Sequence, residues 1–141
     1  MSYTVPFEVF DHTADIGIHA YGETLTALFA HAAQGMESLL VDPNQVQTTT
    51  TRTVTVEAHD EVALLIAWLQ ELIFLFDTEY LLFRAFEIDS ISATKLTARA
   101  SGEAYDGQRH ALSSAIKAVT WHEAAISRGD NGYKARIIFD I

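Results

Sequence analysis

The chain has 141 residues, 49% of them hydrophobic, and its 19 acidic against 9 basic residues give a net charge of −10. This length and apolar content predict one globular domain, 1–141, with a core of its own. The sequence contains no cysteine, which excludes disulfides, thiolate metal sites and a cysteine nucleophile. Because nucleic acid is bound through Lys and Arg, the acidic excess argues against strong nucleic-acid binding by this chain alone, and it is compatible with action on a basic protein that binds nucleic acid.

Neither the start of the chain nor its apolar runs predict secretion or membrane insertion. The first ten residues, MSYTVPFEVF, lack the basic segment and apolar stretch of a signal peptide. The longest apolar run, 62–76, is interrupted by Gln70 and Glu71 and is shorter than the ~20 residues that cross a bilayer. We therefore expect a cytoplasmic protein with no membrane association.

The first part of the chain predicts two short strands and an amphipathic helix. Alternating residues over 7–12 and 17–22 indicate strands, joined by 13–16. The segment 24–41 predicts a helix, which Pro43 ends because proline cannot continue the hydrogen-bond ladder. Its apolar residues at helical spacing are Leu25, Leu28, Phe29, Ala32, Ala33, Met36, Leu39 and Leu40.

A half-buried strand and a second helix are predicted next. Strict alternation over 52–59 is typical of a strand with one face in the core. Asp60 is suited to be the N-cap of a helix over 61–76. This helix is apolar on opposite sides, which predicts that it is buried centrally or contacts a partner.

The rest of the chain predicts further strands in antiparallel pairs. A polar loop occupies 106–115, and the turn 128–132 contains Asp-Asn-Gly, which favours a hairpin. The strands are expected at 82–92, 95–105, 116–127 and 133–141. Short connections between strands predict an α+β fold, with two main helices packed on a mostly antiparallel or mixed sheet.

The C-terminal residues are the first candidate site. On the last strand the Asp140 side chain is followed by one residue, Ile141, whose main-chain carboxylate is free in this sequence. Because strand residues rise ~3.3 Å each, the two carboxylates can converge on one point. All-oxygen ligation suits calcium, magnesium or manganese. The alternative is a frayed end with a solvated aspartate.

The stretch DHTADIG, 11–17, is the second candidate. Asp15 is expected in a turn between the first two strands, where an aspartate often bonds its own backbone. His12 is equally compatible with a structural histidine. The glycines here match neither a dinucleotide fingerprint nor a phosphate-binding loop.

Ionisable residues at predicted strand ends or in loops form the last candidate group: Glu103, Asp106, Lys117 and His122. On one continuous strand Lys117 and His122 point to opposite faces, so a solvated lysine and a histidine at the core edge are the simpler interpretation. No histidines have the spacing of a zinc protease, and no serine lies in a Gly-x-Ser-x-Gly elbow.

Five segments in order resemble the archease family over essentially the whole chain, from Phe7 to Ile141. Trp121 stands where tyrosine is more common in that family. The segments are DHTADIGIHAYG, LLIAWLQELIFLFDTE, SGEAYD, IKAVTWH and the terminal FDI.

The resemblance implies an accessory protein rather than an enzyme. Archeases assist RtcB, the RNA ligase of tRNA splicing and RNA repair, by promoting its guanylylation with GTP and its multiple turnover. The resemblance also implies a divalent-metal site, often described as a calcium site in the family, which maps here to Asp15, Asp140 and the Ile141 carboxylate. His12, Glu103, Lys117 and His122 would face the partner or support the fold.

Several functional hypotheses follow. The acidic rim would dock on a basic cleft of the ligase and position a metal ion there, or binding would shift the ligase toward its competent state. A second class is a chaperone-like modulator of a tRNA-modifying enzyme such as a tRNA methyltransferase, through the apolar helix 61–76. A third, a metal-dependent hydrolase, would use Glu103 or His122 as its base.

Overall fold

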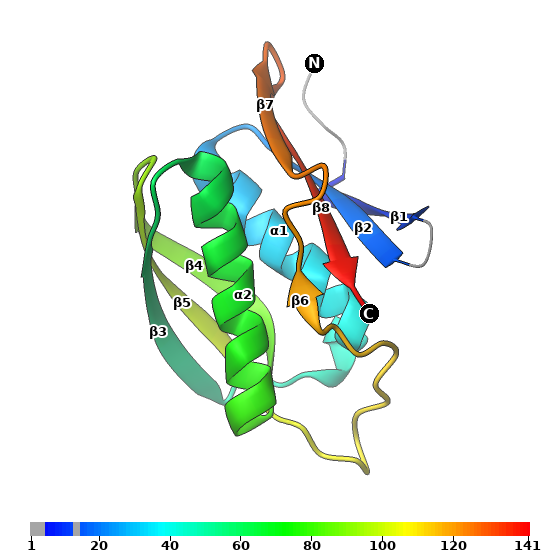
Figure 1. Cartoon of the computed structure of the whole chain (residues 1–141). Coiled ribbons are helices and arrows are strands. Elements are labelled where there is room, and N and C mark those ends of the chain that lie inside the picture. Colours follow the sequence, from blue (N-terminus) through cyan, green and yellow to red (C-terminus); the bar gives the residue numbers. More distant parts are fainter. Residues whose placement is uncertain (1–4, 13–14) are drawn as a thin grey trace.

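The computed structural model describes residues 5–12 and 15–141, and within these ranges the chain forms two α-helices, one 3-10 turn and eight strands (Figure 1). The helices are α1 (Leu25–Leu40) and α2 (Glu61–Glu79), and η1 (Pro43–Gln45) is the 3-10 turn. The strands are β1 (Phe7–His12), β2 (Asp15–Gly22), β3 (Thr50–Glu57), β4 (Leu81–Ile91), β5 (Lys95–Ala104), β6 (Ala118–Val119), β7 (Ala125–Gly129) and β8 (Gly132–Asp140).

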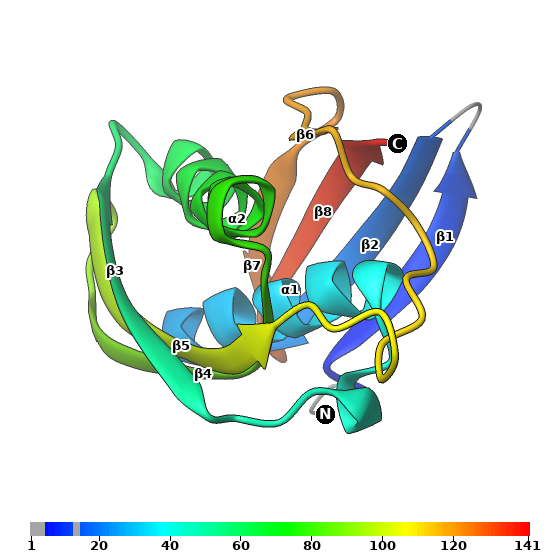
Figure 2. The ribbon, with the colours of Figure 1, turned by 90° about the horizontal axis from the view of Figure 1, so that it is seen from below.

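The described strands form two antiparallel sheets with both helices between them (Figure 2). One sheet has the order β1-β2-β8-β6, with β7 also paired to β8, and the other has the order β3-β5-β4. The α+β class, the antiparallel pairing and the packing of helices on sheets are confirmed. The strands divide between two sheets because two helices with broad apolar surfaces need cover on both sides.

Helix α1 forms where the apolar spacing predicted it. The Thr24 hydroxyl caps its start by accepting a hydrogen bond from the Ala27 N–H at 3.1 Å. Leu28, Phe29 and Met36 are fully buried on the face turned into the core. The helix ends at Leu40, directly before Val41 adopts an extended conformation.

Helix α2 is central, which confirms one of the two outcomes expected from its apolar surface. Asp60 is its N-cap, as predicted, accepting from the Ala63 N–H at 2.8 Å. Trp68 is 0% exposed, and its indole N–H donates to the Phe29 carbonyl at 3.0 Å, which joins the two helices. The helix runs three residues beyond the predicted end, to Glu79, because Tyr80 stops it in a left-handed conformation with φ 59°.

In the described part of the chain, no helix has both the length and the apolar character that crossing a bilayer requires.

The predicted continuous strand 116–127 is wrong. It is divided into the short β6 and β7, separated by a turn in which the Ala124 N–H donates to the Trp121 carbonyl at 3.1 Å and Glu123 has φ 53°. A positive φ breaks the extended backbone, so the pairing with β8 is interrupted there. The predicted turn position of Asp15 is also wrong, since Asp15 is the first residue of β2.

Strand β8 is the last strand in the sequence but lies inside its sheet, between β2 and β6. The predicted hairpin leads into it: Gly129 pairs with Gly132, whose φ is +110°. Ile137 and Phe139 are buried in the core. The expectation of a frayed end is therefore not met up to Asp140, because β8 has a hydrogen-bonded neighbour on both sides.

Candidate functional site

The register between β2 and β8 brings the two candidate aspartates together. Ile16 pairs with Phe139 and Gly17 with Ile138, so the next antiparallel step sets Asp15 opposite Asp140. Side chains directly opposite each other in an antiparallel pair project from the same face, about 4.5–5.5 Å apart at Cβ. We call Asp15, Asp140 and Ile141 the carboxylate edge.

The carboxylate edge is open to solvent. Asp140 is exposed, Asp15 is half-buried, and Ile141 is 40% exposed. Across the described residues, no three His, Cys, Asp or Glu side chains gather as a metal-binding group. A metal site here would therefore rest on two aspartates and one main-chain carboxylate, the set that the resemblance implied.

The glycine of DHTADIG has a structural role beside this edge. A Cβ on Gly17 would lie 2.3 Å from Cζ of Phe10, so the aromatic ring covers the glycine. The Phe10 ring also lies 4.6 Å from the His19 ring and 4.6 Å below the Arg136 guanidinium. The apolar Ile138, paired with Gly17, is fully buried. The edge thus stands next to a closely packed part of the outer face.

Of the four supporting candidates, Lys117 lies beside the carboxylate edge. Its backbone N–H donates to the Asp140 carbonyl at 2.7 Å, and its side chain is exposed. His12 pairs with Asp15 in the β1–β2 register, while its side chain lies outside the described structure. His122 is exposed in the turn after β6, with Nε2 3.7 Å from the Glu123 carboxylate.

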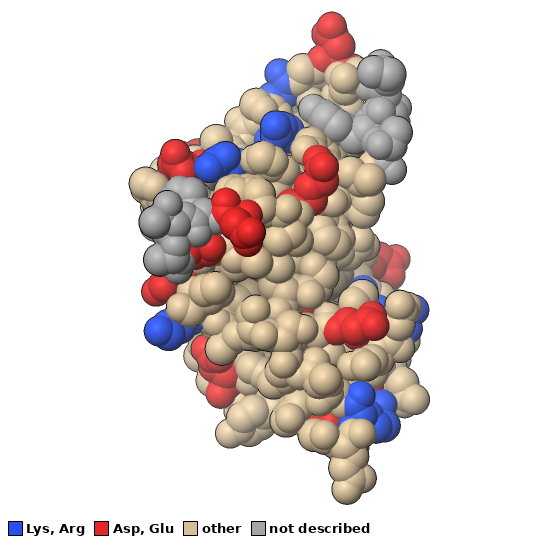
Figure 3. Space-filling model, turned by 90° about the vertical axis from the view of Figure 1, so that its right-hand side faces the viewer, with Lys and Arg blue, Asp and Glu red and all other residues tan. Residues whose placement is uncertain are grey.

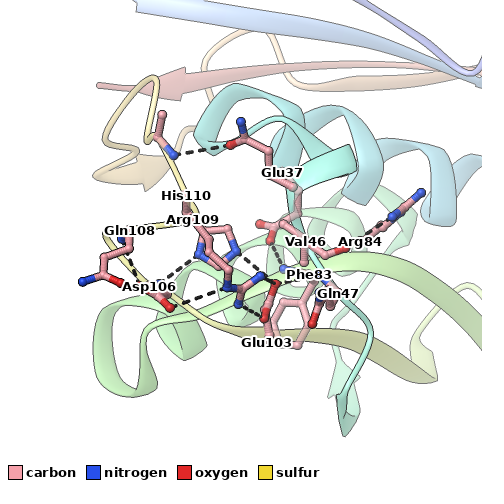
Figure 4. A network of polar contacts seen from close by, with 12 residues as sticks. Glu37, Val46, Gln47, Phe83, Arg84, Glu103, Asp106, Gln108, Arg109 and His110 are labelled. Carbon is pink, nitrogen blue, oxygen red and sulfur yellow. Dashed lines mark hydrogen bonds and ion pairs between the residues drawn. The ribbon is translucent and has the colours of Figure 1, made fainter.

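Glu103 belongs to a separate, buried polar network (Figure 4). Its carboxylate accepts two hydrogen bonds from Arg109, one of them at 3.1 Å, and one from the Gln47 N–H at 2.7 Å. His110 Nε2 lies 3.0 Å from the same carboxylate. The Asp106 N–H donates to His110 Nδ1 at 2.9 Å, so the ring proton is on Nε2 and points at Glu103.

This network makes Glu103 a supporting residue for the loop after β5. The Arg109 hydrogen bonds, above all, lower the pKa of Glu103 to about 2, although burial opposes the shift. A carboxylate of such low basicity is a poor general base, so the hydrolase hypothesis loses one of its two candidates. The predicted Asp106 bonds its own loop, accepting from the Gln108 N–H at 2.9 Å.

Sequence reasoning missed the other members of the network. Arg109 and His110 lie in the segment predicted as a polar loop, and that prediction of a loop is confirmed. The available signal was the basic pair six and seven residues after Glu103. The spacing alone did not distinguish a loop held by ion pairs from one that is solvated.

Glu37 is a second buried carboxyl that sequence reasoning missed. It is 2% exposed on α1, and Oε1 accepts from the Phe83 N–H at 2.7 Å. Strand β4 is the edge of its sheet, so this amide would otherwise have no partner there. Oε2 has no hydrogen-bond partner within the described residues, and burial raises the pKa of Glu37 to about 8. The signal was a glutamate three residues before Leu40 and four after Ala33, on the apolar face.

Charge on the surface is dispersed where it can be seen. On the face in Figure 3, acidic and basic side chains are scattered around a broad area without charged residues. The expected acidic rim is therefore not one continuous patch on this face.

These features define a class of protein: a small acidic α+β protein with two helices between two antiparallel sheets and a carboxylate pair at the end of a central strand. The chain belongs to the Archease protein family (MTH1598/TM1083), whose family model matches residues 7–141. The resemblance seen in the sequence is thereby confirmed.

Curated relatives support this assignment, and solved structures share the fold. The chain is 38% identical to protein archease of Methanothermobacter thermautotrophicus, covering 96% of this chain and 98% of that protein. It is 36% identical to protein archease of Methanosarcina barkeri, covering 96% and 95%. The solution structure of Methanobacterium thermoautotrophicum protein 1598 superposes with a TM-score of 0.83 at 37% identity, covering 96% and 99%. An archease crystal structure from Thermotoga maritima shares the fold, with a TM-score of 0.61 at 18% identity over 94% of each chain.

Proposed function

We propose that this protein is an accessory factor of an RtcB-type RNA ligase and promotes guanylylation and multiple turnover of that enzyme in tRNA splicing and RNA repair. Membership of the archease family supports the proposal. The observation that carries it is the pairing of Ile16 with Phe139 between β2 and β8, because the same register continued by one residue sets Asp15 opposite Asp140. Such a pair of like charges gains stability from a bound cation.

The proposed ligand of the carboxylate edge is a divalent ion, calcium in the first place and magnesium or manganese as alternatives. Two aspartates and the Ile141 main-chain carboxylate offer only oxygen donors, which hard cations prefer. Lys117 stands directly before β6, donates its N–H to the Asp140 carbonyl, and supplies a positive charge at this edge on a long, exposed side chain. Its proposed role is contact with the phosphates or acidic groups of the partner site.

Two mechanisms are compatible with this arrangement. The bound ion can neutralise phosphate charge in the guanylylation site of the ligase. Alternatively, the protein binds the guanylylation-competent ligase more tightly and shifts its population. The first mechanism needs the carboxylate edge, whereas the second needs only the binding surface.

The test is guanylylation of an RtcB-type ligase with GTP, measured without this protein, with it, and with its variants. Asp15→Asn and Asp140→Asn each remove one negative charge from the edge. Asp77→Asn is the matched control, because Asp77 is an exposed aspartate on α2. Calcium binding by each variant is measured separately by calorimetry.

If the metal mechanism holds, Asp140→Asn loses both calcium binding and stimulation, while Asp77→Asn keeps both. Stimulation that survives the loss of calcium binding rejects the metal mechanism and retains the ligase as partner. Absence of stimulation by the intact, folded protein rejects the ligase proposal itself.

A second candidate function is a chaperone-like modulator of a tRNA-modifying enzyme such as a tRNA methyltransferase. The Thermotoga maritima protein of the same fold is described as a possible chaperone. Here Phe74 on α2 is 53% exposed and Tyr80, directly after the helix, is 62% exposed. Exposed aromatic side chains are common binding anchors. If this function holds, Phe74→Ser weakens protection of the methyltransferase from aggregation and leaves ligase stimulation unchanged.

A further inference from the structure

Strand β1 is the last strand at one side of its sheet, and within the described residues no further strand pairs with its outer side (Figure 2). Its inner side is paired with β2, with Phe7 opposite Ala20 and Asp11 opposite Ile16. The outer strand of a sheet presents unpaired N–H and C=O groups, which are a template for another chain. Proteins often protect such an edge with lysine or proline, and β1, FEVFDH, contains neither.

The register identifies which backbone groups of β1 are available. The Tyr21 N–H donates to the Pro6 carbonyl at 2.9 Å, directly before β1 begins. In an antiparallel pair, residues whose backbone groups face the partner strand alternate with residues whose groups face away from it. Glu8 and Phe10 therefore bond to β2. The residues that direct their N–H and C=O groups outward are Phe7, Val9 and Asp11. Val9 is 46% exposed, so this side of the strand is accessible.

Two hollows lie beside this edge, between the start of β1 and helix α1. One has a volume of about 530 Å³ and is lined by Val5, Pro6 and residues of α1. The other, of about 240 Å³, is lined by Phe7, Phe83 and the turn η1. Gln34 of α1 borders both hollows, so they adjoin. A strand added to β1 would direct alternate side chains to the face that α1 covers, where the hollows can receive them.

The charge of the edge favours a basic occupant. β1 carries Glu8 and Asp11 and no lysine or arginine, within a chain of net charge −10. Both acidic residues are exposed. Arg136 lies 4.6 Å from the centre of the Phe10 ring, but its guanidinium is already paired with Glu123 at 3.0 Å. Cross-strand pairs of opposite charge stabilise a sheet, so a strand that places lysine or arginine opposite Glu8 fits this edge.

We propose that β1 is a docking edge for an extended segment of a partner protein, which joins the sheet as a further strand and alternates basic with apolar side chains. The backbone of Phe7, Val9 and Asp11 supplies the hydrogen bonds, and the hollows beside α1 receive apolar side chains. The docking edge uses no residue of the carboxylate edge, so the proposal does not depend on the proposed ligase function.

The probe is a blocked synthetic peptide of alternating lysine and valine, about seven residues long, which is enough to span β1. Two related peptides are its matched controls. In one the peptide nitrogens are methylated, which keeps the charge and removes the N–H donors. In the other glutamate replaces lysine. We would titrate the ¹⁵N-labelled protein with each peptide and follow its backbone amides by NMR.

Strand pairing at this edge predicts a specific pattern of amide changes. The amides of Phe7, Val9 and Asp11 are expected to shift and to gain protection from hydrogen exchange, because their N–H groups acquire acceptors. The amides of Glu8 and Phe10, already bonded to β2, are expected to change less. The lysine–valine peptide is expected to bind with a Kd on the order of a millimolar, and both control peptides at least about fivefold more weakly.

Variants separate the backbone from the side chains. Val9→Pro removes one outward N–H and leaves the bonds to β2, and edge strands accept proline at such positions. It should weaken the peptide at least about fivefold, whereas Val9→Ala keeps the N–H and should change the Kd less than about threefold. Glu8→Gln removes the charge and keeps an acceptor for the Tyr21 hydroxyl, which donates to Glu8 at 2.6 Å, so binding should weaken about two- to fivefold. Glu57→Gln, at an exposed glutamate on β3, is the control and should bind as the wild type does.

Four results would overturn the proposal. One is the absence of amide shifts at roughly ten times the expected Kd. Another is equal binding of the methylated peptide, which would show attraction by charge without strand pairing. The third is equal binding of the glutamate peptide. The last is movement of the same amides when the protein is concentrated without peptide, with light scattering showing a doubled mass, because a second copy of the chain would then occupy the edge.

Discussion

The buried Glu37 carboxyl makes the stability of this protein depend on pH in a defined direction. Its pKa rises from 4.5 to about 8 because burial penalises the charged form. Between these pH values the folded state holds a proton that the unfolded chain has released, so the free energy of unfolding falls as pH rises. Each pH unit between the two pKa values lowers the free energy of unfolding by about 1.4 kcal/mol. The total loss above pH 8 is therefore at most about 5 kcal/mol.

Glu37→Gln removes this ionisation and keeps the acceptor for the Phe83 N–H. We expect the variant to match the wild type within about 1 kcal/mol near pH 5 and to exceed it by on the order of 3–5 kcal/mol near pH 8.5. Urea denaturation at several pH values measures both free energies. Glu57→Gln is the control. The Oε1 of this exposed glutamate lies 3.7 Å from Lys95 Nζ, and exposed ion pairs of this kind contribute only about 0–1 kcal/mol to the free energy of unfolding.

The difference between wild type and Glu37→Gln is the informative quantity, because the net charge of −10 destabilises both proteins alike at high pH. If the two stability curves run parallel from acid to alkaline pH, Glu37 does not titrate in this interval and the reasoning is refuted. A wild type that gains on the variant as pH rises would show that the carboxylate is stabilised in its charged form.

Three further predictions concern other parts of the fold. The pKa of Glu103 is about 2, so the stabilisation that its carboxylate contributes is present above pH 4.5 and is lost as pH falls toward 2. Glu103→Gln should therefore lower the free energy of unfolding near neutral pH by about 2–4 kcal/mol, and much less in acid. Gly102→Ala should cost on the order of 4 kcal/mol or prevent folding, as judged by circular dichroism, because its Cβ would lie 1.8 Å from the Leu82 carbonyl oxygen. Asp89→Asn should leave the free energy of urea unfolding nearly unchanged, since its bonds to Arg99 are exposed and screened by solvent.

Local signals in the sequence predicted most of the elements. Apolar residues at helical spacing located α1, and Asp60 marked the start of α2 through its capping chemistry. The turn before β8 was predicted from Asp-Asn-Gly, and Gly132 has the expected positive φ. These features depend on residues close together in the chain, so periodicity and turn chemistry are sufficient to find them.

Features that depend on distant residues were not predictable in the same way. The division into two sheets depends on which strands pair, and strand spacing does not determine it. Glu103 and Glu37 have ordinary neighbours in the sequence, yet the fold buries both, with a full set of donors around one and a single donor for the other. The break between β6 and β7 arises from a positive φ at Glu123, a residue type that seldom adopts it.

The candidate metal site combines both kinds of information. The resemblance to archease supplied Asp15 and Asp140 as a pair, and the sequence supplied the convergence of Asp140 with the Ile141 carboxylate. What neither provided was the register by which β2 and β8 set the aspartates opposite each other. That register involves residues 125 positions apart, the difference between 140 and 15, and it follows from the burial of Ile18 against Ile137.

The interior position of β8 determines how a metal at this edge would act on the fold. Chain ends usually fray, but β8 is hydrogen-bonded to β2 on one side and to β6 on the other, and the Asp140 carbonyl accepts the Lys117 N–H. The two aspartates are opposite each other only when β2 and β8 are paired. An ion bound by both would therefore stabilise the folded state alone, by about 2.7 kcal/mol at a hundredfold excess over its Kd. Asp140→Asn should abolish that stabilisation and Asp77→Asn should preserve it, so calcium-dependent melting tests the proposed ligand set without any ligase.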